Sequence, residues 1–347
     1  MDFSAIVTRH ANLAASTKWV CDNEMAATIR YVIFTTVLWT GLADFTAAQS
    51  YPNRPIRFIV PYPAGGAGDI FARVIGAKLG DAFGQQVIID NRPGANAIIG
   101  TDMVAKAPPD GHTLIMANSA PFVLNPSLYQ KLPYDPVKDF APVSQGTYYG
   151  YVLIVHPGVA AKSVKELVEL AKAKPMVYAS AGNGSANHLA GEFFAALAGV
   201  RLTHVPYKGS GPALTDVIAG QMPMMFDTPI TAIPQVKGGK VRGLAFSGKR
   251  RAPQLPDIVT MDEAGFKGFE VSSWQGVITT AGTPRDAIER LHQATIRALK
   301  MPDVIDRLAT QGGNELVGSN PDQYAKLIRE EIVKYAKIIK DAGIRVE

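Results

Sequence analysis

One local pattern occurs twice in this chain: an apolar strand, a glycine-rich loop and an amphipathic helix. In the first copy, the apolar run 56–60 leads into a loop at 61–69, and hydrophobic residues then recur at helical spacing over 70–79. In the second copy, 177–179 precede the loop 181–185 and another helical pattern. Strands that alternate with helices are typical of α/β folds with mostly parallel or mixed sheets. The repeat therefore predicts two α/β lobes.

Further segments continue the alternation. The sequence predicts strands at 87–89, 113–116, 151–155, 202–205, 222–226 and 241–246, and helices at 97–107, 163–173, from 211, from 229, at 284–299 and from 321. The helix at 163 is expected to begin with a capping box, because Glu166 follows Ser163 by three residues. The proline-rich segment 118–148 is predicted to be irregular.

Two strand-like segments are candidates for a hinge. They lie near 149–153 and 269–276, where the predicted lobes would be joined. We therefore expect one lobe to comprise 51–150 plus 272–347, and the other to comprise 151–271.

Residues 25–48 have the order of a secretory signal peptide. A segment with one positive charge precedes the apolar run 31–43, and small residues follow it. The run of about 13 residues is too short to span a bilayer, which needs roughly 20. A buried core helix is the alternative. We expect cleavage at the end of this segment and a periplasmic location. Residues 1–24 fit neither a signal nor a domain, which leaves Met1 and Met25 as possible translation starts.

Composition and motifs argue against several function classes. The chain has 35 Lys and Arg against 30 Asp and Glu, but only 249–251 form a basic cluster, without the stacking aromatics expected of a nucleic-acid surface. The single cysteine, Cys21, lies in the segment expected to be absent from the mature chain. No Walker loop, H-E-x-x-H or G-x-S-x-G motif is present. We expect no catalytic set, no metal and no cofactor.

A dinucleotide-binding fold is one alternative, because Asp90 ends the strand that follows the first helix. Its fingerprint requires a small residue after Gly66 and Gly68, however, and Phe71 occupies that position. The sequence therefore disfavours a dinucleotide site.

The two glycine-rich loops are candidates for anion binding. Ligands of open α/β sheets bind beyond the carboxyl ends of the strands. Gly65–Gly68 and Gly182–Ser185 would let the main-chain N–H groups of helix starts approach an anion closely. If the loops face each other across a cleft, they would hold a carboxylate without any arginine. The alternative is that both are simply tight turns.

Several side chains near these loops could assist. Asp69 begins the first helix, where it either caps the helix or meets a ligand ammonium group. His188 lies one turn into the second helix and could donate to a carboxylate or merely pack. Asp227 and Tyr207 follow strand ends that point toward the cleft, and Lys208 is expected to be solvent-exposed.

Linked motifs resemble one known family, the periplasmic receptors of tripartite tricarboxylate transporters, also called the Bug family. The resemblance covers 51 to 347 and rests on the runs 51–69, 87–100 with Asp-Asn-Arg-Pro-Gly-Ala, 109–114, 204–209 with His-Val-Pro-Tyr-Lys-Gly, and 312–321. Only the residues before Met25 depart from the family pattern.

The resemblance implies a two-lobed, type II-like periplasmic binding protein that closes around a di- or tricarboxylate, an acidic amino acid or an aromatic acid. It also implies a membrane transporter with one large and one small subunit as the partner, and we expect the receptor itself to be a monomer. The ligand-binding candidates are Tyr62, Ala64, Gly65, Gly66, Asp69 and Ser119 from the first lobe, and Gly182, Ser185, His188, Tyr207 and Asp227 from the second.

Two other functions use the same residues. An enzyme acting on a carboxylate would need His188 or Asp227 as its base. A ligand-sensing protein would differ only in its membrane partner. The sequence leaves the carboxylate itself open.

Overall fold

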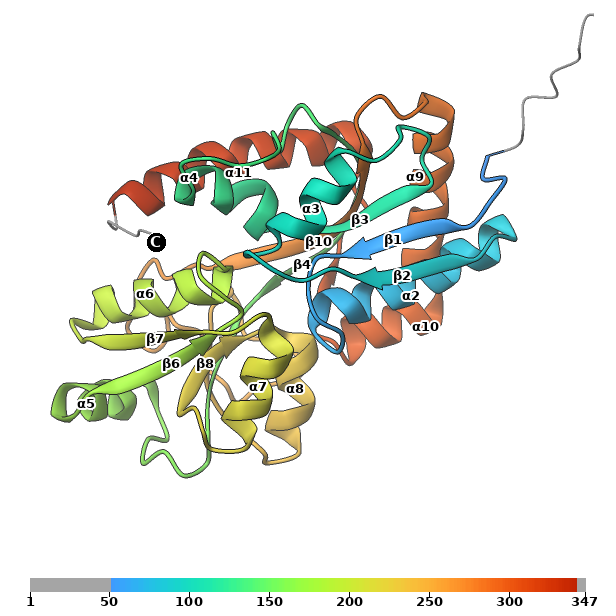
Figure 1. Cartoon of the computed structure of the whole chain (residues 1–347). Coiled ribbons are helices and arrows are strands. Elements are labelled where there is room, and N and C mark those ends of the chain that lie inside the picture. Colours follow the sequence, from blue (N-terminus) through green and yellow to red (C-terminus); the bar gives the residue numbers. More distant parts are fainter. Residues whose placement is uncertain (1–50, 342–347) are drawn as a thin grey trace, which may run out of the picture. The chain divides into compact units, whose positions relative to one another are not determined.

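The computed structural model describes residues 51–341, which fold around two mixed β-sheets flanked by helices (Figure 1). The six-stranded sheet has the order β11-β4-β10-β3-β1-β2, and the five-stranded sheet has the order β7-β6-β8-β5-β9. The two-lobed α/β class expected from the sequence is confirmed. The signal segment expected at 25–48 lies outside the described residues.

The elements have the following bounds. The strands are β1 (Ile56–Val60), β2 (Val87–Asn91), β3 (Thr113–Asn118), β4 (Phe140–Gly150), β5 (Val152–Val155), β6 (Met176–Ser180), β7 (Leu202–Pro206), β8 (Met224–Asp227), β9 (Arg242–Phe246), β10 (Ser272–Thr280) and β11 (Glu315–Leu316). The helices are α2 (Ala67–Phe83), α3 (Ile98–Ala105), η1 (Ala120–Leu124), α4 (Asn125–Leu128), α5 (Val164–Ala173), α6 (Ala186–Ala198), α7 (Ser210–Ile218), α8 (Pro229–Lys237), α9 (Arg285–Leu299), α10 (Pro302–Ile305), η2 (Asp306–Thr310) and α11 (Pro321–Asp341).

Helices cover both faces of the six-stranded sheet. On β1, Phe58 belongs to a core with Phe71 of α2 and Leu291 of α9, whereas its neighbour Ile59 belongs to a core with Tyr324 of α11. Successive residues of a strand point to opposite faces, so a strand buried on both sides reads as one continuous apolar run. Figure 1 shows α3, α4 and α11 on one side and α2, α9 and α10 on the other.

The five-stranded sheet follows the same rule. Val152 and Ile154 of β5 pack in a core with residues of α7 and α8, and Leu153 and Val155 pack in the core that contains α5 and α6. All four side chains are fully buried. The alternation gives this sheet helices on both faces as well.

Helix starts follow the sequence closely. Ser163 accepts a hydrogen bond from the Glu166 N–H at 3.2 Å, which confirms the predicted cap of α5. The Glu166 carboxylate, however, accepts from the Lys162 N–H and not from that of the cap residue. Pro284 is the cap residue of α9 and not its first helical residue.

The prediction that 118–148 is irregular is wrong. This segment contains η1, α4 and most of β4, a strand of 11 residues. Pro142 is tolerated within β4 because only β10 pairs at that position, while β11 pairs with β4 at Thr147 and Tyr148. A proline in a strand needs one side free of ladder hydrogen bonds.

Both sheets are mixed for the same topological reason. β10 runs antiparallel between β3 and β4, and β5 runs antiparallel between β8 and β9, whereas β1 and β6 have parallel neighbours on both sides. The chain passes from the first sheet to the second at Tyr151 and returns to the first at the start of β10.

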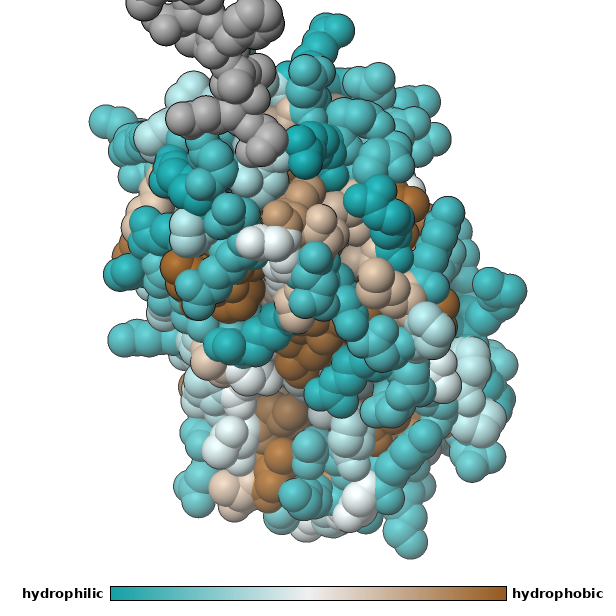
Figure 2. All heavy atoms as spheres, turned by 90° about the vertical axis from the view of Figure 1, so that its right-hand side faces the viewer, coloured by the Kyte–Doolittle hydropathy of each residue, from teal (hydrophilic) through white to brown (hydrophobic). Residues whose placement is uncertain are grey.

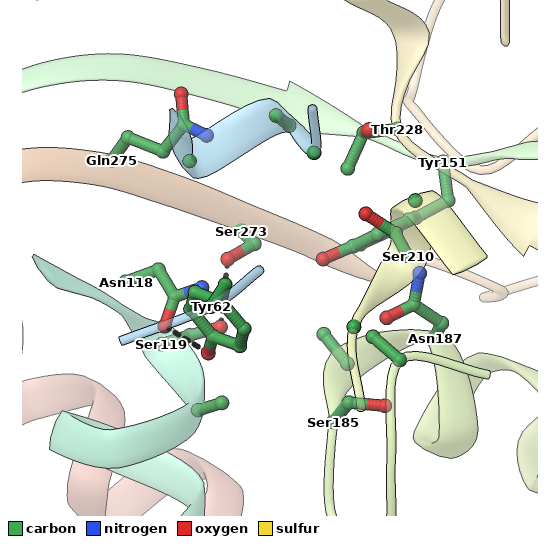
Figure 3. Close-up of a pocket in the computed structure, with 18 of the residues that line it drawn as sticks. Tyr62, Asn118, Ser119, Tyr151, Ser185, Asn187, Ser210, Thr228, Ser273 and Gln275 are labelled. Atoms are coloured by element: carbon green, nitrogen blue, oxygen red, sulfur yellow. Dashed lines mark hydrogen bonds between the residues drawn. The ribbon is translucent and has the colours of Figure 1, made fainter. Parts of the chain in front are cut away.

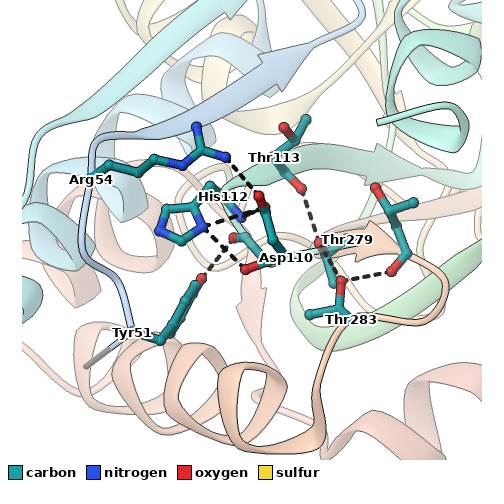
Figure 4. Close-up of polar contacts among 9 residues, drawn as sticks. Tyr51, Arg54, Asp110, His112, Thr113, Thr279 and Thr283 are labelled. Atoms are coloured by element: carbon teal, nitrogen blue, oxygen red, sulfur yellow. Dashed lines mark hydrogen bonds and ion pairs between the residues drawn. The ribbon is translucent and has the colours of Figure 1, made fainter. Parts of the chain in front are cut away.

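The start of the described chain is fastened to the turn before β3 (Figure 4). The Tyr51 hydroxyl donates to the Gly111 carbonyl at 2.7 Å, and Arg54 forms an ion pair with Asp110 at 2.6 Å. The ring of Tyr51 also packs edge-on against His112, with centroids 5.0 Å apart. These contacts anchor the residues that lead into β1.

The face that carries α2, α9 and α10 is largely hydrophilic, with hydrophobic side chains interspersed (Figure 2). Exposed apolar residues scattered over a surface are normal for a globular protein. Within 51–341, no helix has both the length and the hydrophobicity needed to cross a membrane.

We predict that Gly146→Ala destabilises the first sheet. A Cβ on Gly146 would lie 2.5 Å from the ring of Phe71, which is fully buried and cannot move aside freely. Such overpacking lowers the free energy of unfolding by about 1–3 kcal/mol. Gly211→Ala is the control, because its Cβ would meet no atom closer than 3.7 Å. Equal unfolding midpoints in urea for the two variants would contradict the prediction.

Candidate ligand-binding site

A small cavity lies where strand ends of the two sheets face each other (Figure 3). In Figure 3, Tyr62, Asn118, Ser119, Ser273 and Gln275 lie on one side and Tyr151, Ser185, Asn187, Ser210 and Thr228 on the other. The remaining lining residues are Pro63, Gly66, Ala67, Gly68, Ala120, Tyr149, Ala181, Ala186, Gly209 and Gly211. Most of them follow the carboxyl ends of β1, β3, β6, β7 and β8, the usual ligand position in α/β sheets.

The cavity wall carries no charged side chain. Its lining consists of Gly, Ala, Pro, Ser, Thr, Asn, Gln and Tyr among the described residues. The cavity volume is about 50 Å³. Since one enclosed water needs roughly 10–15 Å³ by this measure, the space suits a few waters or a slender ligand group.

Four helices begin at the cavity. The first residues of α2, α6 and α7 line it, as does Thr228, which precedes α8. No side chain caps α2 at Gly66 or α7 at Gly209. The N–H groups of a first helical turn lack intrahelical partners and carry partial positive charge. The cavity is therefore surrounded by main-chain donors suited to an anion.

Hydrogen bonds hold the polar side chains of the wall in place. The Tyr62 hydroxyl donates to Asn118 Oδ1 at 3.0 Å. The hydroxyls of Ser119 and Ser273 lie 2.7 Å apart, which links the residue after β3 to β10. Burial raises the pKa of Tyr62 and outweighs the opposite effect of the bond to Asn118. Its hydroxyl therefore stays protonated over the physiological range.

The loops on the two sides of the cavity touch each other. A Cβ on Gly209 would lie 2.7 Å from Pro63 Cδ, and one on Gly66 would lie 3.4 Å from Ser210 Oγ. Gly209 has φ of +151°, a conformation that side chains rarely adopt. The absence of a side chain at these positions lets the loops meet.

The structure brings some predicted site residues to the cavity and leaves others beside it. Those that line it are Tyr62, Gly66, Ser119 and Ser185. Gly182 and Tyr207 line an adjoining cavity together with Tyr62, and Ala64 and Gly65 are exposed on the loop before α2. Asp69, His188 and Asp227 are buried and lie outside the lining of both cavities.

Asp69 holds the first glycine loop in shape. Its Oδ2 accepts from the Gly65 N–H and from Arg73 Nε, both at 2.9 Å, and its Oδ1 accepts from Asn91 Nδ2 at 3.0 Å. Burial alone would raise the pKa of Asp69, but these hydrogen bonds outweigh burial and lower it. The carboxylate is thus ionised and fully engaged.

His188 supports the second glycine loop. Its Nδ1 accepts from the Gly184 N–H at 3.0 Å, so the proton of the neutral ring is on Nε2, 3.8 Å from Glu192 Oε1. Its ring stacks on His204 with centroids 3.9 Å apart. Burial lowers the pKa of His188 to about 4. The neutral imidazole is therefore part of the turn that starts α6.

Asp227 ends β8 and is fully buried. Its Oδ2 accepts from Thr231 Oγ1 at 2.7 Å, whereas its Oδ1 has no partner among the described residues. Burial raises the pKa of Asp227 to about 7, although hydrogen bonds from Thr231 and Thr228 oppose the rise. An isolated carboxyl is costly to ionise away from water.

Sequence reasoning missed several residues of the wall. The sequence places Ser273 and Gln275 in a candidate hinge segment and Asn118 in a segment predicted to be irregular. Polar residues that interrupt the apolar run of β10 were the available signal. Asn187 lies two residues after the predicted loop 181–185, and Ser210 lies in the connection between the predicted strand 202–205 and the helix from 211, so their places next to strand ends were a second signal.

No group of three or more His, Cys, Asp or Glu side chains within 51–341 is arranged to hold a metal ion.

Comparison with protein families decides the relationship. Residues 71–344 match the model of the tripartite tricarboxylate transporter family receptor, TctC. The chain belongs to this receptor family. The sequence-based assignment to the family is thereby confirmed.

Two relatives illustrate the match. A UPF0065 protein in the tcbD-tcbE intergenic region of Pseudomonas sp. (strain P51) is 41% identical over 294 residues, covering 84% of this chain and 87% of the relative. Protein BugT of Bordetella pertussis is 35% identical over 310 residues, covering 88% and 95%.

Three solved structures share the fold. The periplasmic binding protein BugD aligns with a TM-score of 0.83 at 33% identity, covering 86% of this chain and all of BugD. R. palustris Rpa4515 with adipate aligns at 0.82 and 33% identity, covering 85% and 99%. MatC from Rhodopseudomonas palustris with bound malate aligns at 0.76 and 32% identity, covering 83% and 100%.

We predict that Asp69→Asn lowers the free energy of unfolding by about 1–3 kcal/mol, because the Gly65 and Arg73 donors lose an ionised acceptor. Asp81→Asn, at an exposed position of the same helix, is the control and should change stability by less than about 0.5 kcal/mol. Urea unfolding at neutral pH measures both. A stable Asp69→Asn variant would mean that the carboxylate does not hold the loop.

A second prediction concerns acid. A His188 pKa lowered from 6.5 to about 4 means that the folded state contains the neutral ring, so its contribution is complete above pH 6.5 and is lost as the pH falls toward 4. That contribution is on the order of 3 kcal/mol. Between pH 7 and pH 4, His188→Gln should therefore lose less unfolding free energy than the unaltered chain. Equal losses of unfolding free energy in the two proteins would contradict a lowered pKa of His188 in the folded state.

Proposed function

We propose that this protein is an extracytoplasmic solute-binding receptor that captures a small carboxylate and delivers it to a tripartite tricarboxylate-type transporter with one large and one small membrane subunit. The observation that carries the proposal is the cavity itself, in which four helix starts surround a space with no charged side chain. Family membership supports the transport role.

A carboxylate fits this environment better than a cation or a neutral sugar. Main-chain N–H groups and hydroxyls of the wall can donate to carboxylate oxygens, and the helix dipoles favour negative charge. Hydrogen bonds to an ionised group are about twice as strong as those between neutral groups. Adipate and malate, which occupy two structural relatives, are both carboxylates.

We propose that the ligand enters when two lobes of the protein move apart. We assign 51–150 plus 272–347 to one lobe and 151–271 to the other, with hinge segments near 149–153 and 269–276. Contacts of Gly209 with Pro63 support a closed arrangement, because they bring loops of both sheets together over the cavity. Opening would expose the helix starts to solvent, and closing would exclude water from the ligand.

The protein is proposed to act in the periplasm as a binding protein and not as an enzyme. Residues 25–48 supply the expected export signal. Neither His188 nor Asp227, the two possible bases, lines the cavity. Acid–base catalysis requires a base within hydrogen-bond reach of the substrate.

Trp274 provides the first test. It is the sole tryptophan of residues 49–347, and its neighbours Ser273 and Gln275 line the cavity. We predict that a chain starting at 49, freed of carried-over ligand, changes its fluorescence saturably with adipate, malate, succinate, citrate or aspartate at micromolar concentration or below. The ligand should be recovered chemically intact, whereas its conversion would favour an enzyme.

Gly66→Leu is the matched variant for this titration. Its backbone has φ of −81°, which leucine adopts without strain, but the side chain would enter the narrow space beside Ser210. Binding should be lost while the melting temperature falls little. Full binding by Gly66→Leu would contradict the proposal. So would the absence of any fluorescence change when the unaltered chain is titrated with each carboxylate.

A further inference from the structure

A second cavity adjoins the first. Its volume is about 270 Å³, and the two share Tyr62 and Ala181 in their walls. Like the first cavity, it is lined by residues of both sheets, from the loop at 94–97 and from the segment 206–208. A ligand longer than the first cavity would therefore extend past Tyr62 into the second.

Lys208 is the one residue with a formal charge among the described residues that line either cavity. The residue is exposed, and its ammonium group forms no ion pair or hydrogen bond within 51–341, so its donors are available. The backbone around it is fixed, because the Tyr207 N–H donates to the Ser180 carbonyl at 3.1 Å and Gly209 lies against Pro63. The position of Lys208 at the junction of the loops is thus determined by its neighbours.

The opposite wall of the second cavity is strained. Ala95, Asn96 and Ala97 have φ of 45°, 48° and 70°, three consecutive non-glycine residues in the left-handed region. Asn96 and Asn125 hold this loop through two hydrogen bonds, of 2.7 and 3.0 Å, while Asn96 Oδ1 is buried without a partner. Backbone strain of this kind concentrates at ligand sites, where it presets the shape of a wall.

We propose that the second cavity is a subsite for the distal carboxylate of a dicarboxylate, and that Lys208 is the residue that selects dicarboxylates over monocarboxylates. The inference rests on the proposed function, since one carboxylate is taken to occupy the neutral first cavity. A second negative charge enclosed by neutral walls is unfavourable without a cation nearby. The lysine ammonium, with three donors, supplies that charge.

The test compares two ligands of equal carbon number, adipate and hexanoate, which differ in the distal carboxylate. Fluorescence titration of Trp274 or calorimetry measures both ligands with the unaltered chain, Lys208→Gln and Lys240→Gln. Lys240 is an exposed lysine outside both cavities and controls for the loss of one positive charge. We expect Lys208→Gln to lower the affinity for adipate at least tenfold and the affinity for hexanoate less than twofold. Lys240→Gln should leave both affinities unchanged.

The outcomes separate this inference from the proposed function. Lys208 is not the selecting residue if Lys208→Gln weakens the binding of adipate and of hexanoate equally. The same holds if Lys208→Gln binds adipate as tightly as Lys240→Gln does. The receptor function stands in both cases. If the unaltered chain binds hexanoate too weakly to measure, the adipate ratio between the two variants decides. If it binds no carboxylate at all, the proposed function and the subsite fail together.

Discussion

Main-chain N–H groups at the starts of four helices dominate the chemistry of the central cavity, and much of the fold arranges them there. Each helix follows a strand whose carboxyl end reaches the cavity, so the strand order of both sheets determines where the donors converge. Glycines at 66, 68, 209 and 211 keep side chains away from this region. The positive charge in this region is thus the partial charge of peptide dipoles, and no charged side chain has to be buried to supply it.

Antiparallel strands give the cavity its remaining wall. β10 lies between β3 and β4, and its alternation points Ser273 and Gln275 toward the cavity while Trp274 is buried and donates to Glu331 at 2.6 Å. A ligand contact on one face of β10 is therefore one residue away from the core of the first sheet. The single residue Tyr151, which separates β4 from β5, also lines the cavity, so the chain passes from one sheet to the other at the cavity wall.

Local signals predicted the elements well, and long-range pairing accounts for the failures. The apolar runs, the glycine loops and the Ser163 cap are encoded within a few residues, and the structure has strands and helices there. β4 could not be predicted, because Pro142 is acceptable only on the side that β11 leaves unpaired. The cavity position of Ser273 likewise depends on contacts distant in sequence, because it pairs with Tyr149 of β4 and its hydroxyl lies 2.7 Å from that of Ser119, 154 residues earlier. For Asp69 and His188 the sequence left a ligand contact and a capping or packing role open, because position in the chain does not reveal which hydrogen bonds the folded loops require.

The meeting of the loops over the cavity has a kinetic consequence. Gly209, Gly66 and Gly211 contribute no side chains to interlock, and none of the ion pairs formed within 51–341 joins elements of one sheet to elements of the other. In the proposed cycle, parting the lobes thus breaks none of these ion pairs. The residence time of a ligand then depends on its own contacts with the peptide groups and with Lys208, and on the speed with which water replaces it.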